Sequence, residues 1–219
     1  MIRIGKNDYD GLFISPEYGN QVEFNSAPLE PFKNRRGKII DVGANIGMMS
    51  IILSQEFDCT EIICFEPVKG SCEMADKNLQ ICGIPHKAYN LAISNFNGKM
   101  GFNENGNSQN SKLSLDEKQN TVETRTLDSY EFNDVILIKI DVEGHEVEVM
   151  EGSIETIKRN SPVVLLEYHK EASANRIFEI INELNYNWAS LETDGLFHEE
   201  RINQLLLTPK QLDINHEEV

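Results

Sequence analysis

Short apolar runs that stop at acidic residues set the narrowest limits on the fold of this chain. Runs of this length with little polar alternation are typical of strands buried on both faces. The expected strands are 38–42, 61–66, 86–93, 121–127, 135–141 and 162–168. Between them, the spacing of apolar residues predicts helices over 46–57, 69–82, 146–160 and 172–184. Strands that alternate with helices predict an α/β fold, with a mostly parallel sheet covered on both faces.

The segments outside these strands and helices complete the expected domain organisation. A short strand is expected at 21–24, a polar loop at 103–120, and an antiparallel pair at 187–191 and 195–198 that closes the sheet. At 219 residues the chain fits one large domain. We therefore expect an N-terminal extension packed on the domain (1–36), one α/β domain (37–208) and a polar C-terminal tail (209–219).

Charge narrows the range of partners. The chain has 20 Lys and Arg against 36 Asp and Glu, a formal net charge of −16. Such a chain repels phosphate backbones and anionic lipid surfaces, so we expect no nucleic-acid and no membrane partner. No apolar run approaches the roughly 20 residues of a membrane span, and the first residues lack an export signal, which favours a cytoplasmic protein. The four cysteines have no metal-binding spacing and are expected to be buried, reduced thiols.

A glycine turn with the sequence DVGANIG (41–47) follows the first strand. Glycines permit a tight turn and close approach of a ligand to the backbone, and the next helix offers free N–H groups at its N-terminus. Asp41 would repel a pyrophosphate and attract an ammonium group. The turn has only Gly43 and Gly47, so it also lacks the GxGxxG spacing of dinucleotide sites. Glu66, about 20 residues further on at the end of the second strand, is placed to accept hydrogen bonds from a ribose diol.

Ionisable residues crowd the segment KIDVEGHE (139–146). Strand alternation predicts that Lys139 and Asp141 lie on the same side of the sheet. Asp141 and Glu143 stand at the turn after the strand and are predicted site residues. Glu146 is explained by the favourable interaction of an acid with a helix N-terminus.

Two histidines and one further acid complete the candidates. His145 is either a general base or a capping, solvated side chain, and the sequence leaves both open. Glu167 and His169 close the apolar run 162–168, where a carboxylate is unusual for packing alone. Both are therefore candidate site residues.

Four segments, taken in order, resemble the FkbM-type methyltransferases, which are class I S-adenosylmethionine-dependent enzymes. The resemblance covers roughly residues 38–184. It implies a Rossmann-like three-layer α/β/α sandwich with a seven-stranded sheet whose last strand is antiparallel, and it makes 37–208 the methyltransferase domain. The segments are DVGANIG (41–47), FEP (65–67), TLD (126–128) and KIDVEGHE (139–146).

The resemblance also implies a site. The turn after the first strand would wrap the methionine portion and ribose of the cofactor, Glu66 would bind the ribose hydroxyls, and Ser94 would contact the adenine. The expected cofactor-binding residues are Asp41, Gly43, Asn45, Gly47, Glu66, Ser94 and Asp141. The expected catalytic residues are Asp141, Glu143, His145 and His169.

We expect methyl transfer to a hydroxyl oxygen, with a sugar or glycan, or a small natural product, as the acceptor suggested by the family. Either His145 or His169 would be the base, oriented by Asp141 or Glu143. A second version uses Asp141, Glu143 and Glu167 to hold Mg²⁺, although no metal ligand is assigned.

Two other classes of protein remain open from the sequence. An NAD-dependent oxidoreductase could use Glu66 for its ribose, but the absent GxGxxG pattern and Asp41 oppose it. A non-catalytic binding module is opposed by the intact acids at the strand ends.

Overall fold

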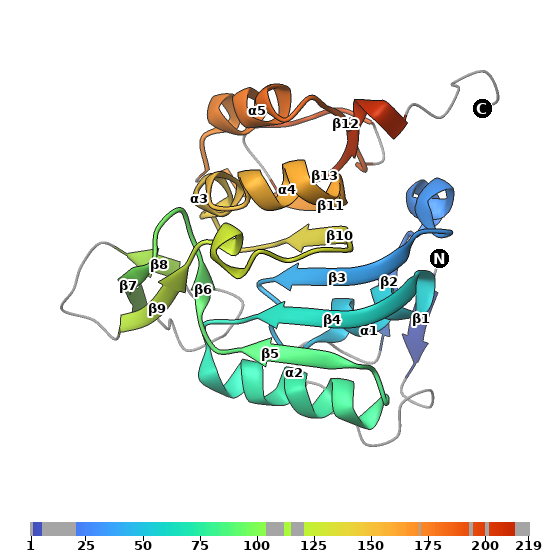
Figure 1. Cartoon of the computed structure of the whole chain (residues 1–219), viewed down its shortest axis with the longest axis vertical. Helices are drawn as coiled ribbons and strands as arrows, with labels where there is room; N and C mark the ends of the chain where they lie inside the picture. The colour runs from blue at the N-terminus through green and yellow to red at the C-terminus, as the bar shows by residue number, and fades with distance from the viewer. Residues whose placement is uncertain are drawn as a thin grey trace.

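A seven-stranded sheet forms the centre of the computed structural model (Figure 1). The structure describes residues 2–5, 21–103, 112–114, 121–170, 172–192, 195–199 and 202–212. The strand order is β12-β13-β11-β10-β3-β4-β5. β13 is antiparallel to both of its neighbours and every other pair is parallel, which confirms the predicted topology. The strands are β3 (Arg36–Val42), β4 (Asp58–Phe65), β5 (His86–Tyr89), β10 (Val135–Ile140), β11 (Val163–Tyr168), β12 (Tyr186–Ser190) and β13 (Asn203–Pro209).

Helices cover both faces of this sheet and complete the predicted three layers. Ile39 and Ile40 are neighbours in β3, yet each is fully buried in a different core cluster. Burial on both faces explains why the strands read as nearly continuous apolar runs. One face carries α1 (Met48–Glu56) and α2 (Lys69–Ile81), and the other carries α3 (Glu146–Glu151), α4 (Ile154–Asn160) and α5 (Ala174–Glu183).

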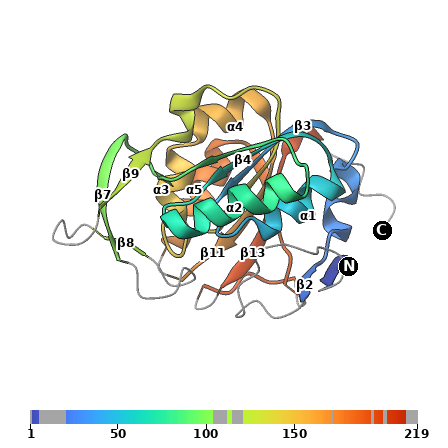
Figure 2. The same ribbon diagram turned by 90° about the horizontal axis from the view of Figure 1, so that it is seen from below.

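Two smaller sheets lie at opposite ends of the molecule (Figures 1 and 2). A four-stranded sheet in the order β6-β9-β7-β8 lies beyond the carboxyl ends of the central parallel strands. A two-stranded sheet pairs β1 with β2, and β2 is the predicted strand at 21–24. The strands are β1 (Ile2–Gly5), β2 (Gln21–Phe24), β6 (Ala92–Ile93), β7 (Gly98–Asn103), β8 (Lys112–Ser114) and β9 (Thr121–Arg125). β7 was not predicted, and β8 replaces part of the expected loop 103–120, most of which lies outside the described residues.

The expected single strand at 86–93 is wrong, because the chain changes sheets within it. β5 ends at Tyr89, and β6 pairs with β9 in the smaller sheet. Between them, the Asn90 side chain donates hydrogen bonds to the carbonyl oxygens of Glu66 and Pro67, at 3.0 and 2.8 Å. These bonds turn the backbone away from the central sheet without a glycine or a proline that would have marked the turn.

Two further predictions need correction. The helix expected over 146–160 is broken between α3 and α4, where a Cβ on Gly152 would lie 2.0 Å from the carbonyl oxygen of Ser94. The antiparallel partner of β12 is β13 and not 195–198. The Asn203 side chain binds the backbone N–H and carbonyl of His198, at 2.7 and 2.6 Å, so a side chain occupies groups that a strand would use.

The sequence also led to predictions about the cysteines and about membrane-spanning helices. All four cysteines are free thiols; Cys64 and Cys72 are buried as predicted, whereas Cys59 and Cys82 are only partly buried. Within the described ranges, no helix combines the length and the apolar character that crossing a membrane requires.

Candidate functional site

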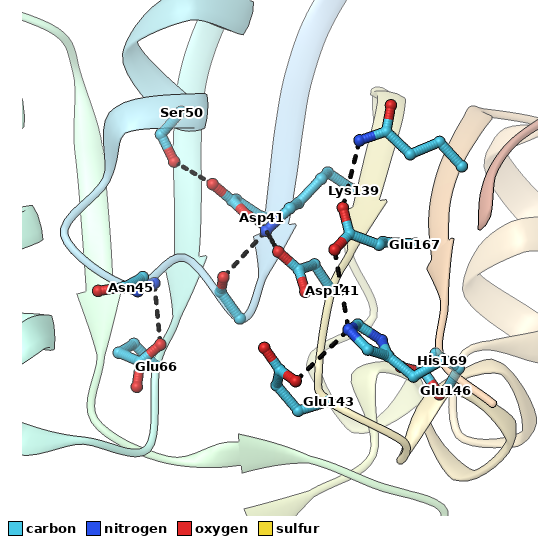
Figure 3. A network of polar contacts seen from close by, with 12 residues as sticks. Asp41, Asn45, Ser50, Glu66, Lys139, Asp141, Glu143, Glu146, Glu167 and His169 are labelled. Carbon is cyan, nitrogen blue, oxygen red and sulfur yellow. Dashed lines mark hydrogen bonds and ion pairs between the residues drawn. The ribbon is translucent and has the colours of Figure 1, made fainter. Parts of the chain in front are cut away.

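The acidic ends of four neighbouring strands meet at one edge of the central sheet (Figure 3). β3 and β10 lie side by side where the strand order reverses, with β4 and β11 outside them. In open α/β sheets, ligands bind outside the carboxyl ends of the strands at this reversal. The candidate site is therefore this edge.

The glycine turn after β3 has a left-handed backbone. Gly43, Asn45 and Gly47 have φ angles of 78°, 50° and 81°. A Cβ on Gly43 would lie 1.8 Å from the carbonyl oxygen of Asp141. Glycine is thus required here by close contact with the end of β10, in addition to any ligand that approaches the turn.

A buried ion-pair network joins β3 to β10 and confirms that Lys139 and Asp141 share one side. Lys139 Nζ lies 3.2 Å from Asp41 Oδ1 and 3.3 Å from Asp141 Oδ2, and it donates to the carbonyl oxygen of Gly43 at 2.9 Å. Asp41 is fully buried and accepts a hydrogen bond from the Ser50 hydroxyl at 2.6 Å. Burial disfavours the charged form of Lys139, but the two carboxylates outweigh it and raise its pKa. The charged form of Lys139 is therefore favoured, and its ammonium group holds both aspartates.

Glu66 lies directly after β4 and is 6% exposed. Its Oε2 accepts the backbone N–H of Asn45 at 2.9 Å, and its Oε1 accepts that of Val68 at 2.8 Å. Burial raises the pKa of Glu66 to about 7, although these two hydrogen bonds favour the carboxylate. Each oxygen has a second lone pair, so Glu66 has the capacity to accept two further hydrogen bonds from a diol.

His169 follows β11 and lies among acids (Figure 3). Its Nδ1 is 2.8 Å from Glu146 Oε1, and its Nε2 is 3.4 Å from Glu143 Oε2 and 3.7 Å from Glu167 Oε1. Burial disfavours the imidazolium, but the hydrogen bond and charge of Glu146, with the charges of Glu143 and Asp141, raise the pKa of His169 to about 9. The structure thus brings together three predicted catalytic residues, Asp141, Glu143 and His169, and the histidine is protonated at neutral pH.

His145 has different partners. Its Nε2 is 3.0 Å from the hydroxyl oxygen of Ser94, and its Nδ1 is 3.4 Å from Glu148 Oε2. Burial lowers the pKa of His145. Two predicted residues, His145 and Ser94, are therefore paired with each other.

Three of these side chains have the ligand types of a metal site. Asp141, Glu167 and His169 each offer one atom, and these atoms lie within 4.8 Å of one another. However, Lys139 already binds Asp141, and the imidazolium of His169 faces Glu143 and Glu167. Cations of the protein itself thus balance much of this negative charge.

Sequence reasoning missed two contributors to the site. Glu146, predicted only to stabilise a helix, is fully buried and bound to His169. The signal available was that the helix begins with two acids, Glu146 and Glu148, of which one suffices for the helix dipole. Gln204 donates to Glu167 Oε2 at 3.3 Å from β13, a strand that the sequence did not predict.

Comparison with known proteins identifies relatives. Residues 41–188 match the family model described as the methyltransferase FkbM domain. Methyltransferase 1 of Beauveria bassiana (strain ARSEF 2860) is 23% identical over 142 residues, which cover 52% of this chain and 57% of the fungal protein.

Solved structures share the fold. Methyltransferase FkbM from Methylobacillus flagellatus KT superposes with a TM-score of 0.56 at 13% identity, covering 91% of this chain and 47% of that one. Precorrin-6y C5,15-methyltransferase from Geobacter metallireducens GS-15 gives 0.52 at 12%, covering 94% and 97%. A Streptococcus mutans protein in complex with S-adenosylhomocysteine (SAH) gives 0.50 at 10%, covering 85% and 99%. The chain spans about half the length of the fungal and M. flagellatus proteins.

Proposed function

The chain belongs to the methyltransferase FkbM domain family, and from this premise we propose that it transfers a methyl group from S-adenosylmethionine to a hydroxyl oxygen. The observation that carries the proposal is the Glu66 carboxylate, buried against the left-handed turn and able to accept a ribose diol. The residues that would hold the cofactor are the turn 41–47 and Glu66. When bound, S-adenosylmethionine supplies an electrophilic methyl group on a positively charged sulfur.

The acidic residues at the carboxyl edge of the central sheet favour binding of a positively charged sulfur. Asp141 and Glu143 follow β10, directly beside the turn that ends β3. A cation at this edge is attracted by them, whereas a pyrophosphate would be repelled. What remains for the protein is to align the acceptor and to manage its proton. Alignment in well-oriented systems contributes roughly 7 kcal/mol or more to lowering a barrier.

The same acids point to the acceptor class. The side chains of Asp141, Glu143 and Glu167 are 30%, 31% and 28% exposed, so each remains open to a bound molecule. Carboxylates accept hydrogen bonds from hydroxyl groups and repel anions. An uncharged or cationic polyhydroxyl acceptor, such as a sugar of a glycan or a small natural product, fits this edge. Nucleic acid does not, given a net charge of −16.

Calorimetric titration with SAH and with NADH tests the first half of the proposal. SAH should bind and NADH should not. Binding of NADH alone would establish the oxidoreductase alternative, and binding of neither would favour a non-catalytic module.

A charge-matched acceptor panel tests the second half. The chain is incubated with S-adenosylmethionine and a neutral hexose, its amino sugar or its uronic acid, and products are read as a mass gain of one methyl group. The neutral and amino sugars should react and the uronic acid should not. Preference for the uronic acid would contradict the assigned acceptor class.

A metal-assisted version of the reaction would use Asp141, Glu167 and His169 to hold a divalent cation that lowers the pKa of the acceptor hydroxyl. The mutual distances of their ligand atoms favour it, whereas the ion pair between Lys139 and Asp141 favours a metal-free reaction. Activity that survives EDTA would exclude the metal-assisted version. Activity lost to EDTA and restored by Mg²⁺ would establish it.

A further inference from the structure

We propose that Glu146 is a positioning residue, which holds the imidazole of His169 in the one orientation and tautomer that lets Nε2 accept the proton of the acceptor hydroxyl. The inference rests on the proposed function and selects the base version of the reaction. It also assigns a role to an acid that the sequence explained by the helix dipole alone.

The burial of Glu146 is the first argument. Glu148 lies in the same first turn of α3 with a side chain that is 38% exposed, so an acid there needs no burial to interact with the helix dipole. A buried carboxylate is costly unless a partner compensates its charge. Glu146 is fully buried, and its partner is His169 Nδ1 at 2.8 Å. The same oxygen accepts the backbone N–H of Gly144 at 2.9 Å, which fixes the direction of the carboxylate.

The orientation of the imidazole is the second argument. His169 is 4% exposed, and its two nitrogens face different surroundings (Figure 3). Nδ1 faces the buried carboxylate, whereas Nε2 faces Glu143 and Glu167, whose side chains remain partly exposed. A carboxylate at Nδ1 keeps the proton on that nitrogen in the neutral ring. The free lone pair then lies on Nε2, on the side of the partly exposed Glu143 and Glu167, where we place the acceptor.

This arrangement completes the proton balance of the proposed reaction. The acceptor oxygen bonds to the methyl carbon as the bond from that carbon to sulfur breaks and its electron pair returns to sulfur. The hydroxyl proton moves to Nε2 of His169, and the imidazolium later releases it to water. Glu146 stabilises that imidazolium and exchanges no proton itself.

The surroundings of His169 define its pH dependence. The groups that face it are Glu146 from α3, Glu143 from the turn before α3, Asp141 from the end of β10 and Glu167 from its own strand. All four are acids and favour the imidazolium, consistent with a pKa of about 9. The rate of a reaction that needs the neutral ring should therefore rise with pH up to about 9.

Nuclear magnetic resonance of the full chain with ¹⁵N-labelled histidine tests the positioning directly. The variants are Glu146→Gln, Glu146→Asp and the matched control Glu179→Gln, an acid that is 63% exposed on α5, and His169→Gln assigns the resonances. The neutral ring of His169 should carry its proton on Nδ1. Glu146→Gln should lower the pKa of His169 by at least one unit and mix its tautomers, Glu146→Asp should restore most of both, and Glu179→Gln should change neither.

An unchanged pKa and tautomer of His169 in folded Glu146→Gln would overturn the proposal. If Glu146→Gln does not fold, the wild type decides, because a carboxylate at Nδ1 should keep the proton of the neutral ring on that nitrogen. A neutral ring of His169 with its proton on Nε2 would then overturn the proposal.

Kinetics test the link to the reaction. His169→Gln should lose about 10²- to 10⁴-fold in kcat, a range usual for general bases, while it keeps its affinity for SAH. In Glu146→Gln the rising limb of the pH profile should move to lower pH by the shift seen in the histidine titration. A pH profile that stays in place, or a requirement for Mg²⁺, would overturn the proposal. If no acceptor is methylated by the wild type while the histidine titration behaves as expected, the proposed function fails and the Glu146–His169 geometry stands.

Discussion

The two halves of the carboxyl edge are built in different ways. The half that we propose to hold the methyl donor, here called the donor half, is the turn 41–47 with Glu66. It is positioned largely by main-chain groups, because N–H groups of the chain bind Glu66 and left-handed residues shape the turn. The half that we propose to face the methyl acceptor, here called the acceptor half, is held by side chains around one imidazole. Its members are Asp141, Glu143, Glu146, Glu167 and His169. The geometry of the donor half thus depends mainly on main-chain groups, whereas that of the acceptor half depends on charge balance among side chains.

Replacement of Lys139, the cation between the donor and acceptor halves, should have the largest effect on the free energy of unfolding. Lys139→Met leaves Asp41 and Asp141 without the ammonium group that lies 3.2 and 3.3 Å away. Removal of one partner from a buried ion pair costs about 3–5 kcal/mol, and we expect that loss in the free energy of unfolding measured with urea. Lys158→Met, at an exposed lysine of α4, is the matched control and should change it by less than about 0.5 kcal/mol. A loss below about 1 kcal/mol in Lys139→Met would show that the halves do not depend on this cation.

Replacement of Gly43, which lies against the end of β10, should have the next largest effect on the free energy of unfolding. Gly43→Ala places a Cβ 1.8 Å from the carbonyl oxygen of Asp141 at a φ of 78°. Left-handed strain of about 1–2 kcal/mol and overpacking of about 1–3 kcal/mol together predict a loss near 3 kcal/mol in urea unfolding. Gly83→Ala is the control, because its φ is 66° and no atom lies within 4 Å of the new Cβ. Equal losses in the two variants would mean that the contact with β10 contributes nothing.

The same contrast explains how much the sequence could predict. The glycine turn and Glu66 were found from sequence because their residue types and spacing follow a recognisable pattern, although the contact between Glu66 and Asn45 spans 21 residues. The bond between Glu146 and His169, which spans 23 residues, was not found, because the helix dipole already explains an acid at a helix start. The structural roles of Asn90 and Gly152 were also missed, since no sequence pattern pairs them with the carbonyl oxygens of Glu66 and Ser94 that lie next to them. Periodicity reveals which residues are buried and leaves open which buried groups meet.

The two halves should also titrate in adjoining pH ranges. In the ligand-free protein the pKa of Glu66 is raised from 4.5 to about 7 and that of His169 from 6.5 to about 9. The stabilisation from each is complete below the unfolded pKa and is lost as the pH rises through the folded pKa. The free energy of unfolding should therefore fall by on the order of 3 kcal/mol across pH 4.5–7 and again across pH 6.5–9.

Urea unfolding of wild type and two variants over pH 4.5–9.5 separates these ranges. Glu66→Gln should flatten the lower one and His169→Gln the upper one. A curve for His169→Gln that runs parallel to the wild type above pH 6.5 would show that its acidic neighbours do not raise the pKa of His169 in the folded state.

The smallest expected effect is on the affinity for SAH and concerns the donor half alone. Glu66→Gln keeps the shape of the side chain but places an amide NH₂ opposite one of the two N–H groups, of Asn45 or Val68, that the carboxylate accepts. The amide oxygen retains one acceptor, so we expect the affinity for SAH to fall about tenfold, or 1.4 kcal/mol, in calorimetric titration. Glu73→Gln, an exposed acid of α2, is the matched control and should bind SAH as the wild type does. Because the acceptor half keeps its charges in Glu66→Gln, the pKa of His169 should stay near 9. An unchanged affinity in Glu66→Gln would place the ribose elsewhere and remove the basis for distinguishing a donor half at all.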